Sequence, residues 1–142
     1  MITYEKHNAL NDALRFVRTK VFIEEQGFEN EFDDIDFACN HLLFFVDGSP
    51  AGCLRYFKKD GEYHIGRVAV LPEFRDRHIG SLMMEKAEEE IRREGGKSIF
   101  VSAQCRVREF YEKSGYKALG DVYYDEFCPH IKMEKNLIIA DN

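Results

Sequence analysis

An α+β fold is predicted for this chain, with a mostly antiparallel mixed sheet and flanking helices. The apolar patterns follow the order strand, helix, three strands, helix, strand, short helix and two strands. The turns between the three central strands are short, which favours antiparallel pairing. A long amphipathic helix leads from the third central strand to the next strand, and such a β-α-β crossover makes those two strands parallel.

The N-terminal part begins with a short strand over residues 1–5. A helix follows, which Asn8 or Asn11 can cap and which runs to about Gln26 with its apolar residues on one face. Gly27 stands where a helix of this length would end.

Three strands are expected next, at residues 41–46, 51–57 and 63–71. The turns between them are Asp47-Gly48-Ser49-Pro50 and Asp60-Gly61, both rich in residues that favour tight turns.

The C-terminal part begins with an amphipathic helix over residues 79–94. Its apolar stripe predicts packing against the sheet. A strand at 98–102 and a short helix at 107–114 follow, and two strands at 116–123 and 130–135 form a closing hairpin.

Composition limits the functional classes. The 142 residues are 44% hydrophobic and carry a net charge of −6, which is typical of a single globular domain over 1–142 and disfavours nucleic acid and anionic membranes as partners. No targeting stretch precedes the first strand, and the four cysteines form no C-x-x-C pair, so we expect reduced thiols in the cytoplasm. Neither the cysteines nor the histidines have metal-ligand spacing, and no metal is expected.

The segment between the third central strand and the long helix is the most informative. A strand ends at Pro72, a short basic loop follows, and a helix begins near Ile79. Unpaired N–H groups and the positive end of the dipole at a helix N-terminus favour an anion, and Arg75 and Arg77 add charge at the same place. We therefore predict a pyrophosphate-binding loop, where Gly80 lets a phosphate or a neighbouring backbone come close.

These residues resemble a known family. Arg75-x-x-His78-x-Gly80 is similar to the R/Q-x-x-G-x-G/A signature of the GNAT N-acetyltransferase superfamily, and the run from Glu109 to Tyr116 looks like its second landmark. The resemblance covers essentially the whole chain and implies a GNAT-like fold and acetyl-CoA as co-substrate. It implies direct transfer of an acetyl group to a primary amine of a small molecule, in a ternary complex.

The resemblance also implies roles for single residues. Tyr111 matches the tyrosine that protonates the leaving thiolate, and Gln104 stands where many relatives carry a cofactor-contacting Asn. His78 replaces a glycine of the signature, so its side chain either crowds the pyrophosphate, if φ is positive there, or donates to a phosphate. The residues expected to bind the cofactor are Val68, Ala69, Val70, Arg75, Asp76, Arg77, His78, Ile79, Gly80 and Gln104.

The acceptor side is less defined by the sequence. Many relatives carry a general base where this chain has Gly66, which leaves Glu25, His41, His64 and His130 open as bases. Seven carboxylates between Glu24 and Asp36 predict a surface that attracts a cationic amine, with a solvated loop as the alternative. Arg18-x-x-Val21-Phe22-x-x-Glu25-Gln26, with Pro129-His130-Ile131 near the end, is similar to a bacterial GNAT branch described as glucosamine-phosphate-acetyltransferase-like. With His41 added from the base candidates, the residues expected on the substrate side are Arg18, Glu25, Gln26, His41 and His130.

Two other functions remain open at this stage. The chain could be a CoA-binding sensor that kept the fold and lost turnover, because it lacks the usual glycine and the usual base. It could also acetylate protein lysines, to which an acidic face would be suited. A homodimer is compatible with a chain of this size and aromatic content.

Overall fold

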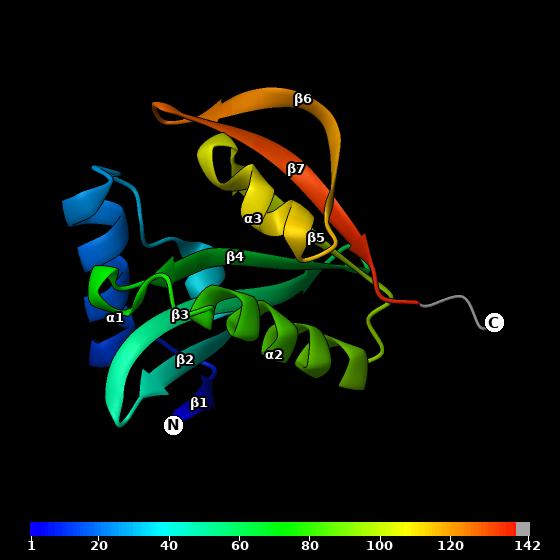
Figure 1. Ribbon diagram of the computed structural model, residues 1–142. Coiled ribbons are helices and arrows are strands. Elements are labelled where there is room, and N and C mark those ends of the chain that lie inside the picture. Colours follow the sequence, from blue (N-terminus) through cyan, green and yellow to red (C-terminus); the bar gives the residue numbers. More distant parts are fainter. Residues whose placement is uncertain (139–142) are drawn as a thin grey trace.

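Seven strands form one sheet within residues 1–138, the part of the chain that the computed structural model describes (Figure 1). The strands are β1 (Ile2–His7), β2 (Asn40–Val46), β3 (Ser49–Lys59), β4 (Glu62–Val70), β5 (Ser98–Gln104), β6 (Lys117–Asp125) and β7 (Cys128–Asn136). Their order is β1-β2-β3-β4-β5-β7-β6, and only the β4–β5 pair is parallel. The predicted α+β fold and its parallel crossover are confirmed.

Two tight turns connect β2 to β3 and β3 to β4. The backbone φ angles are 48° at Asp47 and 84° at Gly48, and 51° at Asp60 and 80° at Gly61. Positive φ at both central residues is the pattern of type I′ turns, whose twist matches that of antiparallel strands. Both predicted turns are confirmed, although the first is shorter than expected because residues 49 and 50 already belong to β3.

The first helix, α1 (Asp12–Arg18), begins after Asn11. The Asn11 side chain accepts a hydrogen bond from the backbone N–H of Leu14 at 2.8 Å, which satisfies one of the free donors of the first turn. Of the two predicted caps, Asn11 is therefore confirmed, and Asn8 is wrong.

The predicted helix to Gln26 is only partly α-helical. From Thr19 to Glu25 the chain forms π-helical turns, in which the N–H of Gln26 donates to the carbonyl of Val21 at 3.1 Å. The apolar spacing did not reveal this widening, since Val17 and Val21, which it places on one helical face, are both buried in the structure as well. Gly27, with φ of 81°, ends the element as predicted.

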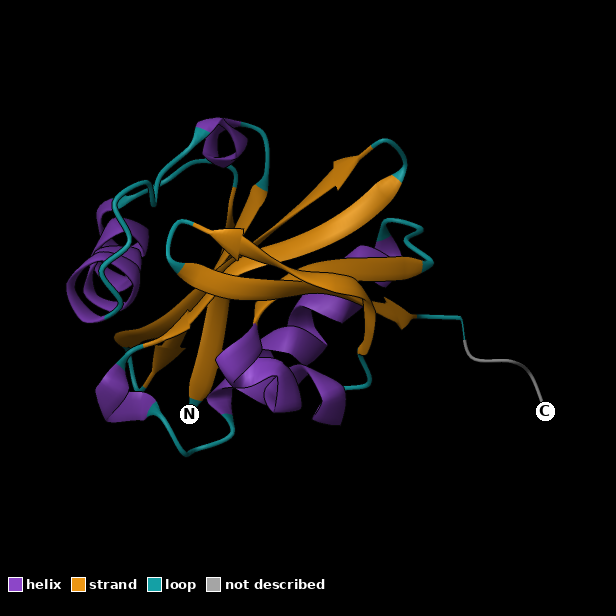
Figure 2. Cartoon of the chain, turned by 90° about the horizontal axis from the view of Figure 1, so that it is seen from above, coloured by secondary structure: helices purple, strands orange, loops and turns teal. Residues whose placement is uncertain are grey.

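Two helices follow in the C-terminal part, α2 (Ile79–Arg93) and α3 (Arg108–Lys113), both close to their predicted ranges. Helices α1 and α2 cover opposite faces of the sheet (Figures 1 and 2). Alternate residues of β2 pack against them, with Leu42 and Phe44 in the cluster under α2 and Leu43 in the cluster under α1. No helix among residues 1–138 is long and apolar enough to cross a membrane.

Strands β4 and β5 pair over three residues only and then diverge. The paired residues are Tyr63–Ile65 of β4 and Ile99–Val101 of β5. Beyond them, the register of the β3–β4 pair shifts, and Arg67 adopts a φ of 51°, which bends β4 away from β5. Meanwhile β5 stays paired with β7 along its whole length. The result is a V-shaped gap inside the sheet.

Candidate functional site

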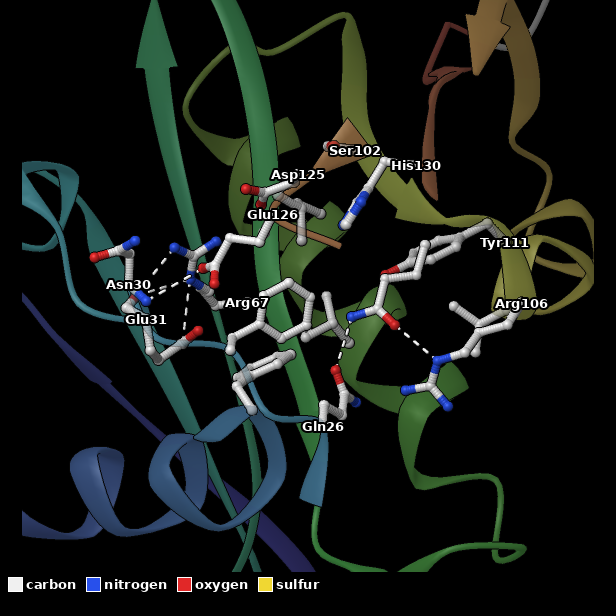
Figure 3. Close-up of a pocket in the computed structure, with 17 residues that line it drawn as sticks. Gln26, Asn30, Glu31, Arg67, Ser102, Arg106, Tyr111, Asp125, Glu126 and His130 are labelled. Carbon is white, nitrogen blue, oxygen red and sulfur yellow. Dashed lines mark hydrogen bonds and ion pairs between the residues drawn. The ribbon is translucent and has the colours of Figure 1, made fainter. Parts of the chain in front are cut away.

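A pocket lies in this gap and is lined by six segments of the chain (Figure 3). They are the bent part of β4, the C-terminal part of β5, α3 with the turn before it, the β6–β7 turn, β7 at His130, and the segment that includes and follows the π-helical turns. The lining residues are Phe22, Gln26, Phe28, Asn30, Glu31, Ile65, Gly66, Arg67, Val68, Ser102, Gln104, Arg106, Val107, Tyr111, Asp125, Glu126 and His130.

The edge of β4 that faces the gap lacks a partner strand. No residue of β5 pairs with the part from Gly66 to Val70, although β3 pairs with its other edge. Backbone N–H and C=O groups need partners when they are removed from water. This edge can therefore hydrogen-bond to an extended ligand that enters the gap. Side chains alternate here, with Val68 and Val70 beside the α2 cluster and Ala69 in the α1 cluster.

The N-terminus of α2 has features of an anion site. No side chain caps this helix, and Leu82 is the first residue whose N–H reaches back to the carbonyl of His78. The Ile79 side chain is buried, so this residue can offer only its backbone N–H. Orphan donors at the positive end of a 15-residue helix favour an anion.

The loop before α2 is left-handed at two residues. Asp76 has a φ of 63° and His78 a φ of 60°. The sequence raised positive φ at His78 as a condition for crowding, and that condition is met. At Gly80, a Cβ would lie 3.1 Å from the ring of Phe110. Its lack of a side chain admits this ring into contact with α2.

The two arginines of the loop differ. The Arg75 guanidinium donates to both carboxylate oxygens of Glu25, each at 2.6 Å, and its Nε donates to the carbonyl of Val70 at 3.0 Å. Arg77 is exposed, lies over the ring of Phe74 at 5.5 Å, and forms no salt bridge within residues 1–138. The charge that remains available to an anion is therefore that of Arg77, while Arg75 ties the π-helical segment to the end of β4.

Tyr111 of α3 points into the pocket (Figure 3). Its ring packs edge-to-face against Phe110 at 5.0 Å and Tyr116 at 5.9 Å. Burial raises the pKa of its hydroxyl above the usual value, so the group keeps its proton at neutral pH. No residue among 1–138 forms a hydrogen bond to this hydroxyl, which leaves its proton free to be donated to a ligand.

A chain of side-chain hydrogen bonds crosses the pocket from the turn before α3 to the end of the π-helical segment. Nε of Arg106 donates to Oε1 of Gln104 at 2.8 Å, and Nε2 of Gln104 donates to Oε1 of Gln26 at 2.8 Å. This chain places two predicted residues, Gln104 and Gln26, side by side. Arg106, two residues after Gln104, was not singled out from the sequence, because no motif includes it.

Three predicted substrate residues, Arg18, Glu25 and His41, do not line this pocket. Arg18 is 1% exposed and donates to Glu31 at 2.8 Å and to Asp36 at 2.7 Å. His41 is also buried, with Nε2 3.1 Å from the carbonyl oxygen of Asp36, and burial lowers its pKa. In place of the expected substrate contact, Arg18 and His41 both contact Asp36, which lies after the π-helical turns, and Glu25 is held by Arg75.

The predicted acidic surface is corrected by the structure. Glu24 pairs with Lys20, and Glu25 pairs with Arg75. Three further carboxylates belong to a group that we call the arginine–carboxylate cluster, in which opposite charges lie within salt-bridge distance. Since most of the run is neutralised by arginines from other segments, it does not form an open acidic funnel. The members of the cluster are Arg18, Glu31, Asp33, Asp36, Arg55 and Arg67.

The β6–β7 turn closes over the pocket and was missed by the sequence reasoning. The Glu126 carboxylate accepts hydrogen bonds from the backbone N–H groups of Glu29 at 3.0 Å and Asn30 at 3.2 Å. The ring of Phe127 stacks on that of Phe28 at 5.1 Å. These contacts join residues almost a hundred positions apart, and no local pattern could have indicated them.

Comparison with known proteins identifies the family. The model of the acetyltransferase (GNAT) domain matches residues 8–137. An uncharacterised N-acetyltransferase of Bacillus subtilis, YjcF, is 34% identical over 131 residues, which is 89% of this chain and 92% of YjcF. The chain belongs to the GNAT acetyltransferase family. It is an acetyl-CoA-dependent N-acyltransferase of this family, and the resemblance seen in its two motifs is confirmed.

Solved structures show the same fold. The structure of an N-acetyltransferase from Lactobacillus plantarum superposes with a TM-score of 0.88 at 24% identity and covers 96% of this chain and 99% of that one. A GNAT structure from Elizabethkingia anophelis with acetyl-CoA bound has a TM-score of 0.77 at 14% identity and covers 96% and 98%.

Proposed function

We propose that this GNAT enzyme transfers an acetyl group from acetyl-CoA to a primary amine of a small molecule, by direct transfer in a ternary complex. The observation that carries the proposal is the unpaired edge of β4, which leads from the free N-terminus of α2 to the pocket below Tyr111. Acetyl-CoA supplies an acyl group that is activated as a thioester. The chain's own groups bind acetyl-CoA, exclude water from the site, and accept or donate the protons that the transfer moves.

Three features of the chain fit the parts of acetyl-CoA. The orphan N–H groups of α2 and the free charge of Arg77 fit a pyrophosphate. The β4 edge at Val68 and Val70 fits the amide groups of the pantetheine arm, as a strand partner would. A backbone N–H near Val70 is our candidate to polarise the thioester carbonyl. The Elizabethkingia relative, which binds acetyl-CoA on the same fold, supports this reading.

Tyr111 is our candidate general acid. Its hydroxyl is protonated, desolvated and unpaired, and it opens on the pocket. Proton donation to the departing thiolate is a role that such a group can fill, and general acids typically contribute about 10²–10⁴-fold to the rate.

The acceptor side is part of the same proposal. The pocket is closed above by the β6–β7 turn, which favours a small amine over a long peptide. Membership of the glucosamine-phosphate-acetyltransferase-like branch remains our proposal as well. So does a cytoplasmic location, which the four free thiols support.

Calorimetric titration with acetyl-CoA, followed by a free-thiol release assay against pooled amines, tests this function. We expect binding and thiol release, and splitting the pool then identifies the acceptor. Binding without release from any amine would favour the CoA sensor instead. Absence of binding would contradict the proposal.

Two arginine variants sharpen the test. Arg77→Ala should weaken acetyl-CoA binding by about threefold to tenfold, with a larger effect at low salt, because an exposed charge is screened. Arg75→Ala should weaken acetyl-CoA binding less, because Glu25 already neutralises that guanidinium. A greater loss for Arg75→Ala would mean that Arg75 leaves Glu25 for a phosphate, and unaltered affinity in the double variant would overturn the loop assignment.

A further inference from the structure

An attacking amine must lose a proton, and the residue that accepts it is not assigned by any comparison. The sequence left Glu25, His41, His64 and His130 open. A base has to reach the pocket and must have a free lone pair there. The structure allows each candidate to be tested against these two conditions.

Three of the four candidates fail. The Glu25 carboxylate is bound to Arg75 through both oxygens, and this bond is the main cause of its lowered pKa. His41 is buried beside Asp36, outside the pocket. His64 lies before the divergence of β4 and β5, stacked between Phe57 at 5.1 Å and Phe100 at 5.7 Å, and it does not line the pocket.

The carboxylates that line the pocket fail these conditions as well, because each is either bound to other groups of the protein or exposed to solvent. Glu31 is 3% exposed and accepts from Arg18 at 2.8 Å, with Arg67 at 3.1 Å. Both oxygens of Glu126 accept backbone N–H groups. Asp125 has no partner among residues 1–138, but it is exposed at the rim, where water solvates its charge.

His130 meets both conditions. Its Nδ1 lies 2.9 Å from the carbonyl oxygen of Cys128, and because a carbonyl can only accept, Nδ1 carries the proton. In the neutral ring the lone pair is then on Nε2, which has no hydrogen-bond partner among residues 1–138 and opens on the pocket (Figure 3). The ring is 6% exposed and is fixed by stacking on Tyr123 at 6.0 Å and by an edge contact with Phe28 at 6.5 Å.

We propose that His130 is the general base of the transfer, and that the Cys128 carbonyl holds it in the required tautomer. The proposal rests on the proposed function. The amine nitrogen attacks the thioester carbonyl carbon, so that a C–N bond forms and the C–S bond breaks, with its electron pair leaving on sulfur. The proton of the attacking nitrogen passes to Nε2 of His130, and the Tyr111 hydroxyl gives its proton to the thiolate. Exchange with solvent then resets both side chains.

The two groups approach the pocket from different elements, with His130 on β7 and Tyr111 on α3 (Figure 3). His130 is opposite Gln104 in the β5–β7 register, and so it lies next to the hydrogen bonds that join Arg106, Gln104 and Gln26 across the pocket. Proton uptake and proton donation thus occur at separate points of one cavity.

The charged groups that share the pocket with the imidazole come from every wall around it. Arg67 and Glu31 lie on the β4 side, Arg106 lies on the side of α3, and Asp125 and Glu126 lie in the turn above. The neutral titratable neighbours are Tyr111, whose burial raises its pKa, and Tyr123, whose hydroxyl is hydrogen-bonded to Ser102. No cation contacts Nε2 among residues 1–138, so the lone pair is free for a proton.

His130→Asn is the most informative variant. The Asn amide can still donate to the Cys128 carbonyl, as Nδ1 does, but it offers no base at the position of Nε2. We expect kcat to fall about 100-fold or more, with acetyl-CoA affinity within about twofold by calorimetry. The acid limb of the pH profile should disappear, and the rate should keep rising with alkaline pH as the free amine becomes available in solution. His7→Asn, the same change at a surface site, is the matched control.

A second measurement is independent of turnover. In ¹⁵N NMR spectra of the wild-type protein, neutral His130 should show a protonated Nδ1 and an unprotonated Nε2. A protonated Nε2 in the neutral ring would overturn the proposal. So would an unchanged pH profile in His130→Asn, or an acid limb that is lost in Asp125→Asn instead. Failure of the wild-type protein to bind acetyl-CoA would contradict the proposed function and leave the NMR result as a separate test.

Discussion

Two walls face each other across the pocket. On the β4 side, Arg67 and Glu31 belong to the arginine–carboxylate cluster, where guanidinium and carboxylate groups are bound to one another. On the opposite side, the Tyr111 hydroxyl and Nε2 of His130 have no partners among residues 1–138. A polar group that the protein has already satisfied maintains geometry, whereas one left open on a cavity can exchange protons. The β4 wall therefore maintains the geometry of the pocket, and the opposite wall carries the groups that can exchange protons.

The largest effect is expected on the β4 side of the pocket, in the arginine–carboxylate cluster. Asp36 accepts hydrogen bonds from Arg18 at 2.7 Å and from Arg55 at 2.9 Å, and it is 1% exposed. Asp36→Asn should lower the free energy of unfolding by about 3–5 kcal/mol, because it leaves buried guanidinium charge uncompensated. Urea denaturation measures this. Asp34→Asn, an exposed neighbour without a salt bridge among residues 1–138, should stay within about 0.5 kcal/mol.

The same carboxylate should make the free energy of unfolding depend on pH. Burial alone would raise the pKa of Asp36, but the hydrogen bonds from Arg18 and from the backbone of Asp33 outweigh it and lower the pKa to about 2. A carboxylate with a depressed folded-state pKa stabilises the fold at neutral pH, and this contribution is lost as the pH falls from about 4 towards 2. Asp36→Asn should flatten the acid limb of the stability curve, and an equally steep limb would contradict the assignment.

An intermediate effect is expected on the opposite side of the pocket, at Tyr111. Tyr111→Phe should lower turnover by about 100-fold, or about 2.7 kcal/mol in the barrier, and leave stability and acetyl-CoA affinity nearly unchanged. The matched control is Tyr116→Phe, since its hydroxyl donates to the buried Glu88 at 2.9 Å outside the pocket. That variant should lose about 1–2 kcal/mol of stability and keep its turnover. Equal rates for wild type and Tyr111→Phe would exclude Tyr111 as the acid.

The smallest effect is expected at His78, the residue that immediately precedes α2. Its φ of 60° is strained for a residue with a Cβ, so His78→Gly should gain about 0.5 kcal/mol in stability and bind acetyl-CoA at least as well as wild type. His78→Ala keeps the strain and removes the imidazole. If calorimetry shows that both variants bind acetyl-CoA more weakly, the imidazole contacts a phosphate and does not crowd it.

The sequence predicted what depends on neighbours along the chain. Apolar periodicity located the strands and α2, and paired turn residues such as Asp60-Gly61 located the hairpins. Motif spacing likewise located the loop before α2 and Tyr111. These features follow from local backbone preferences, which a single sequence records.

The remaining features depend on contacts between distant residues. Arg75 meets Glu25 across 50 positions, and Arg55 meets Asp36 across 19, so the acidic run could not be recognised as neutralised. His130 could not be preferred over His41 or His64, because the choice depends on which ring nitrogen faces a carbonyl and which faces a cavity. Such a choice follows from tertiary packing, which no spacing rule encodes.

The divergence of β4 from β5 has a consequence for solubility. A strand edge without a partner normally invites a strand from another molecule, and natural proteins cover or distort such edges to avoid aggregation. Here the open edge, from Gly66 to Val70, lies inside the sheet and not at its border. The β6–β7 turn, latched by Glu126, and the segment around Phe28 enclose it. The protein thus keeps free backbone donors and acceptors for an extended small ligand while denying them to another polypeptide.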